Sequence, residues 1–264
     1  MKGKHFKESK SKFSFKKVIK ICFVILLIIT IFLIAKYFIL ENKDKKESEN
    51  ILDNININED DITEQKTKRM LQLEELKKQN EDIIGWIEIN GTNINYPVMQ
   101  TTDNEFYMTH NYKKEYSAIG SLFLDKDYNW ELPSTNLLIY GHNNKNETML
   151  QNLTNYKNES YYKEHPDIKF TTINEDAEYE IIAAFYSRVY YKNEKNVFRY
   201  YYFINANNKE EFDNYVNESK KASIYNTGKT AEYGDQLLTL STCSYHTENG
   251  RFAVVARKKK NKSN

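Results

Sequence analysis

The chain has 264 residues, with 38 Lys and Arg side chains against 37 Asp and Glu, and its charge is unevenly distributed. Residues 1–40 contain nine lysines and one acidic residue, whereas the rest of the chain contains 29 basic and 36 acidic side chains. A basic head on a mildly acidic body argues against nucleic acid as the main partner, because phosphate binding needs positive charge on the folded domain. Two cysteines, Cys22 and Cys243, are too few for a disulfide scaffold or a cysteine-based zinc site.

Residues 18–40 predict a single membrane-spanning anchor. Twenty of these 23 residues are apolar, and as a helix they would cover roughly 34 Å, enough to cross the hydrocarbon core of a bilayer. The eight lysines before residue 21 favour a cytoplasmic head, residues 1–17, and an extracellular C-terminal part. A cleaved signal peptide is the alternative, but the apolar run is long and no A-x-A-like site follows it.

The remaining chain divides into a stalk and one domain. Residues 41–62 are polar, charged and free of aromatic side chains, which is typical of a flexible stalk. Residues 63–80 contain strong helix formers and predict a surface helix with Thr63 as its N-cap. The extracellular domain is therefore expected to span residues 63–264.

From residue 81 the sequence consists mainly of short apolar segments that are typical of β-strands. The turn signal Asn90-Gly91 lies between residues 83–89 and 94–99 and predicts a hairpin. A helix is expected over residues 209–224. Further strands are expected at residues 120–125, 136–142, 168–173, 178–189, 235–245 and 251–258. Strands with helices inserted between them indicate a mainly β fold, a barrel-like core with peripheral helices.

The cysteine outside the membrane segment is a candidate nucleophile. Cys243 ends the apolar run LLTLSTC, where a predicted strand leaves the core. A reactive thiol needs a base or a cation beside it, although a free cysteine can also be a small buried hydrophobe. His142 follows the strand NLLIY and Gly141, a position where a fold can hold an imidazole rigidly. A purely structural role for this histidine stays open, and the other extracellular histidines, His110, His165 and His246, lie in polar stretches where we expect them to be solvated.

An arginine on the next strand could complete such a site. Arg251 starts the predicted strand that follows Cys243, and a short hairpin would place its guanidinium beside the thiol. There it could donate hydrogen bonds to a developing oxyanion, or it could be an ordinary arginine at a strand end. Arg257, on the same strand but near the charged tail, is expected to be solvated.

Together these features resemble the sortases, the cysteine transpeptidases of Gram-positive cell surfaces. The resemblance rests on TLSTC in the penultimate strand, on YGH about 100 residues earlier, and on an arginine in the last strand. The helix before the cysteine-bearing strand, the N-terminal helix and the order of elements in residues 96–125 are similar to class B, over roughly residues 65–258. The resemblance implies a sortase-type closed β-barrel with an N-terminal helix and a helix inserted before the cysteine-bearing strand.

The resemblance also implies a reaction without a metal or organic cofactor. Cys243 would attack a threonine carbonyl in a C-terminal sorting motif of a secreted protein, with His142 as general acid and base. Arg251 would bind the substrate backbone or the oxyanion. An amine of a lipid-linked peptidoglycan precursor would resolve the thioester and so anchor the surface protein to the cell wall.

Four further residues match positions that line the substrate groove in class B relatives, namely Tyr140, Ser241, Asn104 and Met108. The residue after the cysteine is Ser244, where some relatives carry an acid, and this departure bears on fine specificity.

Three alternatives remain at this point. A papain-like cell-wall cysteine hydrolase usually has its cysteine before its histidine and at a helix N-terminus, the reverse of the order here. A non-catalytic surface binding domain would keep its function in a Cys243→Ala variant. A pilus-polymerising sortase often carries a lid and a C-terminal membrane helix, and neither is apparent in the sequence.

Overall fold

The computed structural model describes residues 15–52, 55–59, 62–63, 67–144, 146 and 148–260. The chain divides between Asn42 and Lys43 into two compact units. Most of the predicted cytoplasmic head lies outside the described residues.

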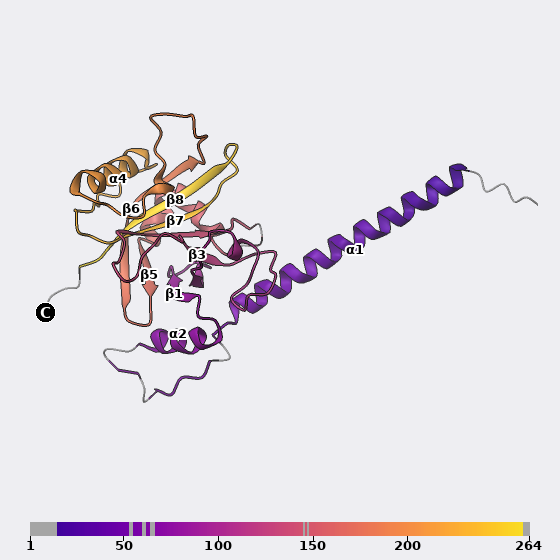
Figure 1. Cartoon of the computed structure of the whole chain (residues 1–264), viewed down its shortest axis with the longest axis horizontal. Coiled ribbons are helices and arrows are strands. Elements are labelled where there is room, and N and C mark those ends of the chain that lie inside the picture. The colour runs from indigo at the N-terminus through magenta and orange to yellow at the C-terminus, as the bar shows by residue number, and fades with distance from the viewer. Residues whose placement is uncertain are drawn as a thin grey trace, which may run out of the picture. The chain divides into compact units, whose positions relative to one another are not determined.

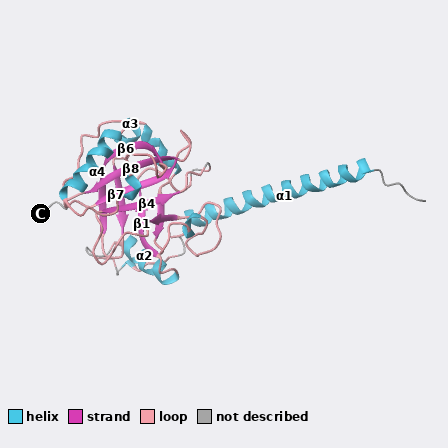
Figure 2. Ribbon diagram, turned by 45° about the horizontal axis from the view of Figure 1, so that its top comes forward, coloured by secondary structure: helices cyan, strands magenta, loops and turns pink. Residues whose placement is uncertain are grey.

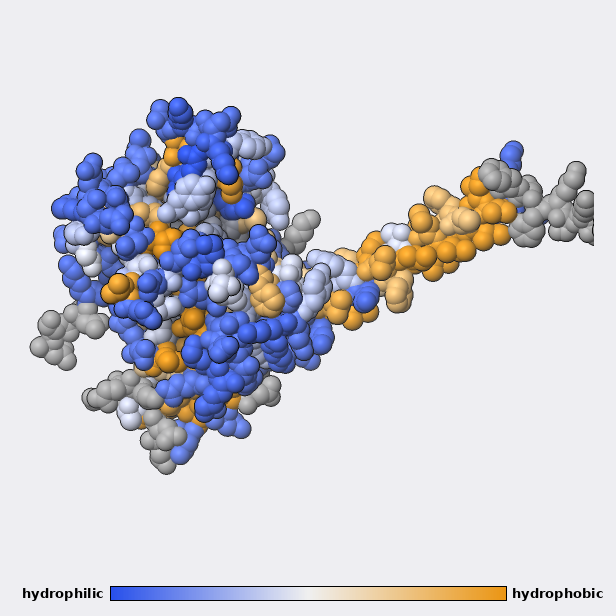
Figure 3. All heavy atoms as spheres, in the orientation of Figure 1, coloured by the Kyte–Doolittle hydropathy of each residue, from blue (hydrophilic) through white to orange (hydrophobic). Residues whose placement is uncertain are grey.

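Helix α1 (Phe15–Glu49) contains the predicted anchor. The described residues hold one helix long and apolar enough to cross a membrane, over Lys16–Ser48, and none of its most apolar stretch is buried. Figure 3 shows its apolar surface in orange, whereas the visible face of the second unit is mostly hydrophilic. This helix is consistent with a membrane anchor.

The predicted flexible stalk is wrong in its first half, because α1 continues through residues 41–49. Most of residues 41–49 are Glu and Lys, which are good helix formers, and adding residues to an existing helix is easier than starting a new one. In addition, Asp44 and Ile51 belong to the second unit and are buried within it, and burial fixes this part of the chain.

The described residues form one closed barrel of eight strands in the order β1-β2-β3-β4-β7-β8-β6-β5 (Figure 1). The pairs β2–β3 and β4–β7 are parallel, and the other pairs are antiparallel. The strands are β1 (Ile83–Glu88), β2 (Asn95–Met99), β3 (Leu122–Leu124), β4 (Asn136–Gly141), β5 (Asp167–Thr171), β6 (Asp176–Arg188), β7 (Leu237–Cys243) and β8 (Gly250–Lys258). Each strand lies within a segment predicted from the sequence or overlaps it within a few residues.

Helices lie outside the barrel. Figure 2 shows α2 and α4 on different sides of the strands. Thr67, and not the predicted Thr63, caps α2: its hydroxyl accepts a hydrogen bond from the Met70 backbone N–H at 3.3 Å. The helices are α2 (Lys68–Gln79), α3 (Glu159–Glu164) and α4 (Lys209–Ala222), with short 3-10 turns at Phe106–Met108, Gln151–Lys157 and Tyr200–Tyr202.

Alternation along the strands separates the core inside the barrel from the cores outside it. In β4, Leu137 and Ile139 belong to the cluster that fills the barrel, whereas Leu138 between them belongs to the cluster under α4. Successive side chains of a strand point to opposite faces, so one apolar run serves both cores. Because β4 is packed on both faces, its C-terminal end is held firmly.

Candidate active site

Two parallel strands bring the predicted nucleophile and base together. Strands β4 and β7 pair in register from Asn136 and Leu237 to the last pair, Gly141 and Thr242. His142 comes directly after Gly141, and Cys243 comes directly after Thr242. Both residues therefore lie at the same edge of the sheet. The hydroxyl of Thr242 donates to the carbonyl of Gly141 at 2.7 Å and ties the two strand ends to each other.

The third predicted residue comes from the neighbouring antiparallel strand. Cys243 on β7 pairs directly with Arg251 on β8. The guanidinium Nη1 of Arg251 donates to the carbonyl of Gly250 at 2.9 Å and lies 3.5 Å from the carbonyl of Asn249. A guanidinium has five N–H donors, so these contacts, both through Nη1, leave donors for a substrate.

The His142 ring is fixed by its backbone and by a loop. Nε2 lies 2.7 Å from the carbonyl oxygen of Met108. A carbonyl only accepts, so Nε2 donates its proton there and Nδ1 is the nitrogen left for proton transfer. Gly141, just before the histidine, allows the end of β4 to pack closely on Leu122 and Leu150. A Cβ there would lie 2.2 Å from Leu122 Cδ2 and 2.8 Å from Leu150 Cγ.

The three residues line one groove with a cavity of about 250 Å³. All seven residues predicted from the sequence are in its wall. The lining consists of Asn104, Met108, Phe123, Tyr140, Gly141, His142, Val189, Tyr200, Tyr201, Ser241, Thr242, Cys243 and Arg251. A mostly apolar groove with a few convergent polar groups is the usual form of a substrate site.

Comparisons with known proteins agree with this geometry. The sortase domain family model matches residues 87–259. The Listeria monocytogenes sortase B is 31% identical over 188 residues, which cover 70% of this chain and 73% of that protein. The chain belongs to the sortase family.

Solved structures agree that the class is B. The Clostridium perfringens sortase B structure is 32% identical with a TM-score of 0.64 and covers 71% of this chain and 99% of its own. A B. anthracis sortase B structure is 27% identical with a TM-score of 0.69 and covers 84% of this chain and 99% of its own. This class B sortase is therefore a cysteine transpeptidase of cell-wall sorting, and the papain-like alternative and the non-catalytic binding domain are set aside.

A buried carboxylate joins two of the predicted groove residues in this sortase. Asp125, which is 5% exposed, accepts hydrogen bonds through Oδ2 from Asn104 Nδ2 and from the Tyr140 hydroxyl, both at 3.0 Å. Burial, and then the charge of Asp125, raise the pKa of Tyr140 well above its ordinary value, so the phenol stays neutral and donates. The sequence analysis did not single out Asp125.

Tyr200, Tyr201 and Val189 also line the groove and were missed from the sequence. They come from the connection between β6 and β7, where tyrosines are too frequent to distinguish a groove residue from a core residue. Ser241 is buried and forms a 2.7 Å hydrogen bond with the Tyr200 hydroxyl. Burial raises the pKa of Tyr200.

Asn143 was also missed. Its Nδ2 donates to the Cys243 carbonyl at 2.8 Å and so joins the residue after the candidate base to the candidate nucleophile. No sequence signal marks this contact, because an asparagine in a turn usually serves the turn itself.

The prediction that Arg257 is solvated is wrong. Its guanidinium pairs with Glu180, lies 3.7 Å from Asp235, and is 22% exposed. Strand β6 pairs with β8 and places Glu180 directly opposite Arg257, which sequence spacing alone does not reveal.

His110, His165 and His246 lie outside the groove lining. His110 stacks on Phe106, and His246 packs against Tyr186. His165 lies 2.7 Å from the Asn90 carbonyl through Nδ1, so it is hydrogen-bonded and not simply solvated as expected. Among the described residues, no group of three or more His, Cys, Asp or Glu side chains is arranged to hold a metal ion.

Proposed function

We propose that Cys243, His142 and Arg251 carry out the transpeptidation. The Cys243 thiol gives its proton to His142 Nδ1, and the resulting thiolate attacks the carbonyl carbon of a threonine in the sorting motif, so that a C–S bond forms. The C–N bond then breaks, and the leaving amine takes a proton from His142. An incoming amine attacks the thioester, gives a proton to His142, and the thiolate leaves.

Arg251 is assigned to the oxygen of the scissile carbonyl. This oxygen gains negative charge in both tetrahedral intermediates, and a fixed cationic donor beside it lowers both barriers. The observation that supports the proposal is the register of the neighbouring strands β4, β7 and β8. With this register His142, Cys243 and Arg251 line one groove. Tyr140, Ser241, Asn104 and Met108 are assigned to binding the sorting motif in the same groove.

The proposed partners are a secreted protein with a C-terminal sorting signal and a lipid-linked peptidoglycan precursor that supplies the amine. The test uses the full chain in lipid nanodiscs, a library of peptides and an added amine. The expected product ends at threonine and carries the amine, and Cys243→Ala forms none. Cleavage that continues in Cys243→Ala would overturn the assignment.

We also propose a topology in which residues 1–17 are cytoplasmic, residues 18–40 span the membrane, and the catalytic domain is extracellular. The lysines before the apolar span support this orientation. Protease added to intact cells with a permeable wall should remove the domain and leave the head. Protection of the domain in this assay would contradict the topology.

A further inference from the structure

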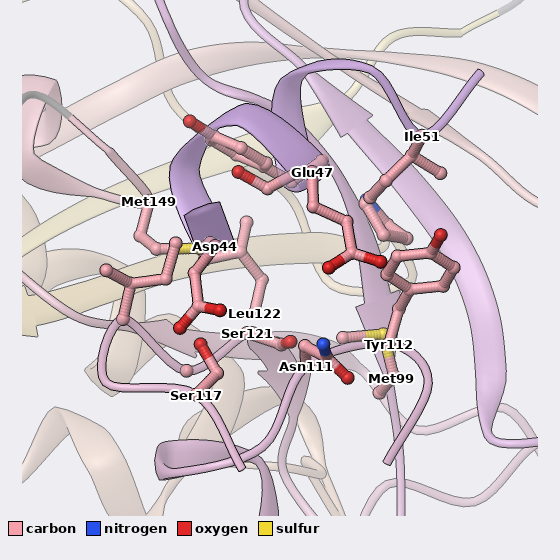
Figure 4. A pocket seen from close by; sticks show the side chains of 15 residues that line it. Asp44, Glu47, Ile51, Met99, Asn111, Tyr112, Ser117, Ser121, Leu122 and Met149 are labelled. Atoms are coloured by element: carbon pink, nitrogen blue, oxygen red, sulfur yellow. The ribbon is translucent and has the colours of Figure 1, made fainter. Parts of the chain in front are cut away.

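Residues 43–52, the last turns of α1 and the residues just after it, belong to the second unit and lie outside the groove lining. We call residues 43–52 the docking segment. Asp44 is 9% exposed, and its Oδ2 accepts a hydrogen bond from the Ala118 backbone N–H at 3.1 Å. Ile51 is buried in a cluster with Tyr112. Figure 4 shows Asp44 beside Ser117 and Glu47 beside Tyr112 of the facing loop.

Two more contacts hold the docking segment in place. Glu47 forms an ion pair with Lys113, and its hydrogen bond raises the pKa of the Lys113 ammonium. Lys45 Nζ donates to the Asn146 carbonyl at 3.0 Å. Lys113 and Ala118 belong to the loop between Met108 and β3, whereas Asn146 belongs to the turn that follows His142. The docking segment thus contacts both stretches of chain that flank the imidazole.

The loop at residues 109–121 reaches His142 from both of its ends. Met108, just before it, supplies the carbonyl that accepts from His142 Nε2. Gly120, near its other end, has φ +61°, and a Cβ there would lie 2.6 Å from the Met108 carbonyl oxygen and 3.0 Å from His142 Cδ2. Both ends of the loop therefore form the surface on which the ring rests.

The base of this loop is closed by its own hydrogen bonds: the Ser117 N–H donates to the Thr109 carbonyl and the Ser121 N–H donates to the Tyr107 carbonyl, both at 2.9 Å. Its only ladder contact among the described residues is a single bridge between His110 and Tyr116. Because these bonds tie the two ends of the loop together, the loop moves as one piece, and a shift at Ala118 is passed on to Met108 and Gly120. The loop and the docking segment line one small cavity of about 20 Å³ and contact each other beside it, so a shift of one displaces the other.

We propose that Asp44 is a positioning residue for His142: it holds the loop at residues 109–121 so that Met108 and Gly120 fix the imidazole. This inference rests on the proposed role of His142. Asn104 is held separately, by Asp125 and by the Lys126 backbone N–H at 2.8 Å. Loss of Asp44 therefore affects the placement of the base more than the binding of the peptide.

The test uses the full chain in lipid nanodiscs and measures kcat and KM for peptide cleavage. Asp44→Ala should lower kcat about tenfold, since small misplacement of a reacting group costs up to about 10²-fold. KM should change by a smaller factor, because Met108 is the one residue assigned to peptide binding that borders the loop. Asp44→Asn should recover most of the activity, because its amide oxygen can accept the same N–H. Lys46→Ala is the matched control, since Lys46 is an exposed residue of the same helical turn.

A second readout does not depend on turnover. NMR of the histidine ring carbons should show a shifted or broadened His142 signal in Asp44→Ala and an unchanged signal in Lys46→Ala. A contact that only stabilises the fold would lower the melting temperature and leave this signal and kcat unaltered, which would overturn the inference. If Asp44→Ala does not fold, Glu47→Gln decides: it should lower kcat about threefold, and an unchanged kcat and His142 signal would overturn it.

The inference and the proposed function fail in different ways. If His142→Ala retains activity, the role of the base is wrong. If His142→Ala is inactive while Asp44→Ala keeps wild-type kcat and ring signal, only the positioning role is wrong.

Discussion

Replacing Arg251 tests the electrostatic part of the mechanism. The side chain comes from the residue paired with Cys243, and both of its backbone contacts use Nη1, so its other donors are free to meet the substrate oxygen. Losing one oxyanion donor typically slows turnover by about 10²–10³-fold, or roughly 3–4 kcal/mol. We expect Arg251→Ala to lower kcat/KM by that factor. Arg251→Lys should recover only part of it, because lysine lacks the planar fork.

Arg257→Ala controls for damage to strand β8. Removing one partner of a buried ion pair costs about 3–5 kcal/mol. Here the cost should be nearer 2 kcal/mol, because Arg257 is partly exposed and Glu180 keeps a second partner, Lys229, at 2.9 Å. That corresponds to a melting temperature about 4–8 °C lower.

Peptide cleavage below the melting temperature and thermal unfolding of the same samples separate the two effects. Arg251→Ala should lose activity with little change in melting temperature, and Arg257→Ala should show the opposite pattern. If both variants lost activity equally while folded, strand integrity would be the cause and the role of Arg251 would be refuted. A loss that appears only in KM would make Arg251 a binding residue without a specific role in the transition state.

Three further variants or conditions probe the rest of the account. Burial alone would raise the pKa of Glu180, but its hydrogen bonds from Arg257 and Lys229 outweigh this and lower it below its ordinary value of 4.5. The stability from this group is therefore present above that ordinary pKa and is lost as the pH falls through the lowered pKa of the folded state, so Arg257→Ala should flatten the acid limb of melting temperature against pH. Gly141→Ala should lower the stability by about 1–3 kcal/mol and should also lower kcat, because the alanine Cβ would collide with buried Leu122. Full activity at wild-type stability would show that the close packing of Gly141 on Leu122 is not needed. Asn104→Ala should raise KM about three- to tenfold with kcat little changed, and an unchanged KM would remove it from the groove assignment.

Much of the barrel could be predicted because its strands are short, apolar and separated by turn signals. The hairpin of β1 and β2 followed from Asn90-Gly91, and residues 209–222 followed from helical spacing. The parallel pairing of β4 with β7 could not be predicted, since it joins residues about 100 positions apart and leaves no local pattern. The closeness of His142 and Cys243 was therefore expected only from the resemblance to sortases.

The errors have local causes. The stalk was judged by polarity, but a polar segment stays helical when it continues an apolar helix and buries even two side chains, here Asp44 and Ile51. Arg257 was judged by its nearness to the charged tail, although an opposite charge on β6 lies across from it. Asp125 was overlooked because a carboxylate that joins two groove walls is visible only when both walls are in place.

Trapping the acyl-enzyme tests the central claim most directly. The full chain in nanodiscs would be mixed with a sorting-motif peptide without an amine acceptor, quenched in acid and examined by mass spectrometry after digestion. The account predicts an adduct on the peptide that contains Cys243, with the mass of the substrate fragment ending at threonine. The adduct should be removed by hydroxylamine, as a thioester is, and be absent in Cys243→Ala. The same adduct in Cys243→Ala, or on another residue of the wild-type chain, would contradict the account.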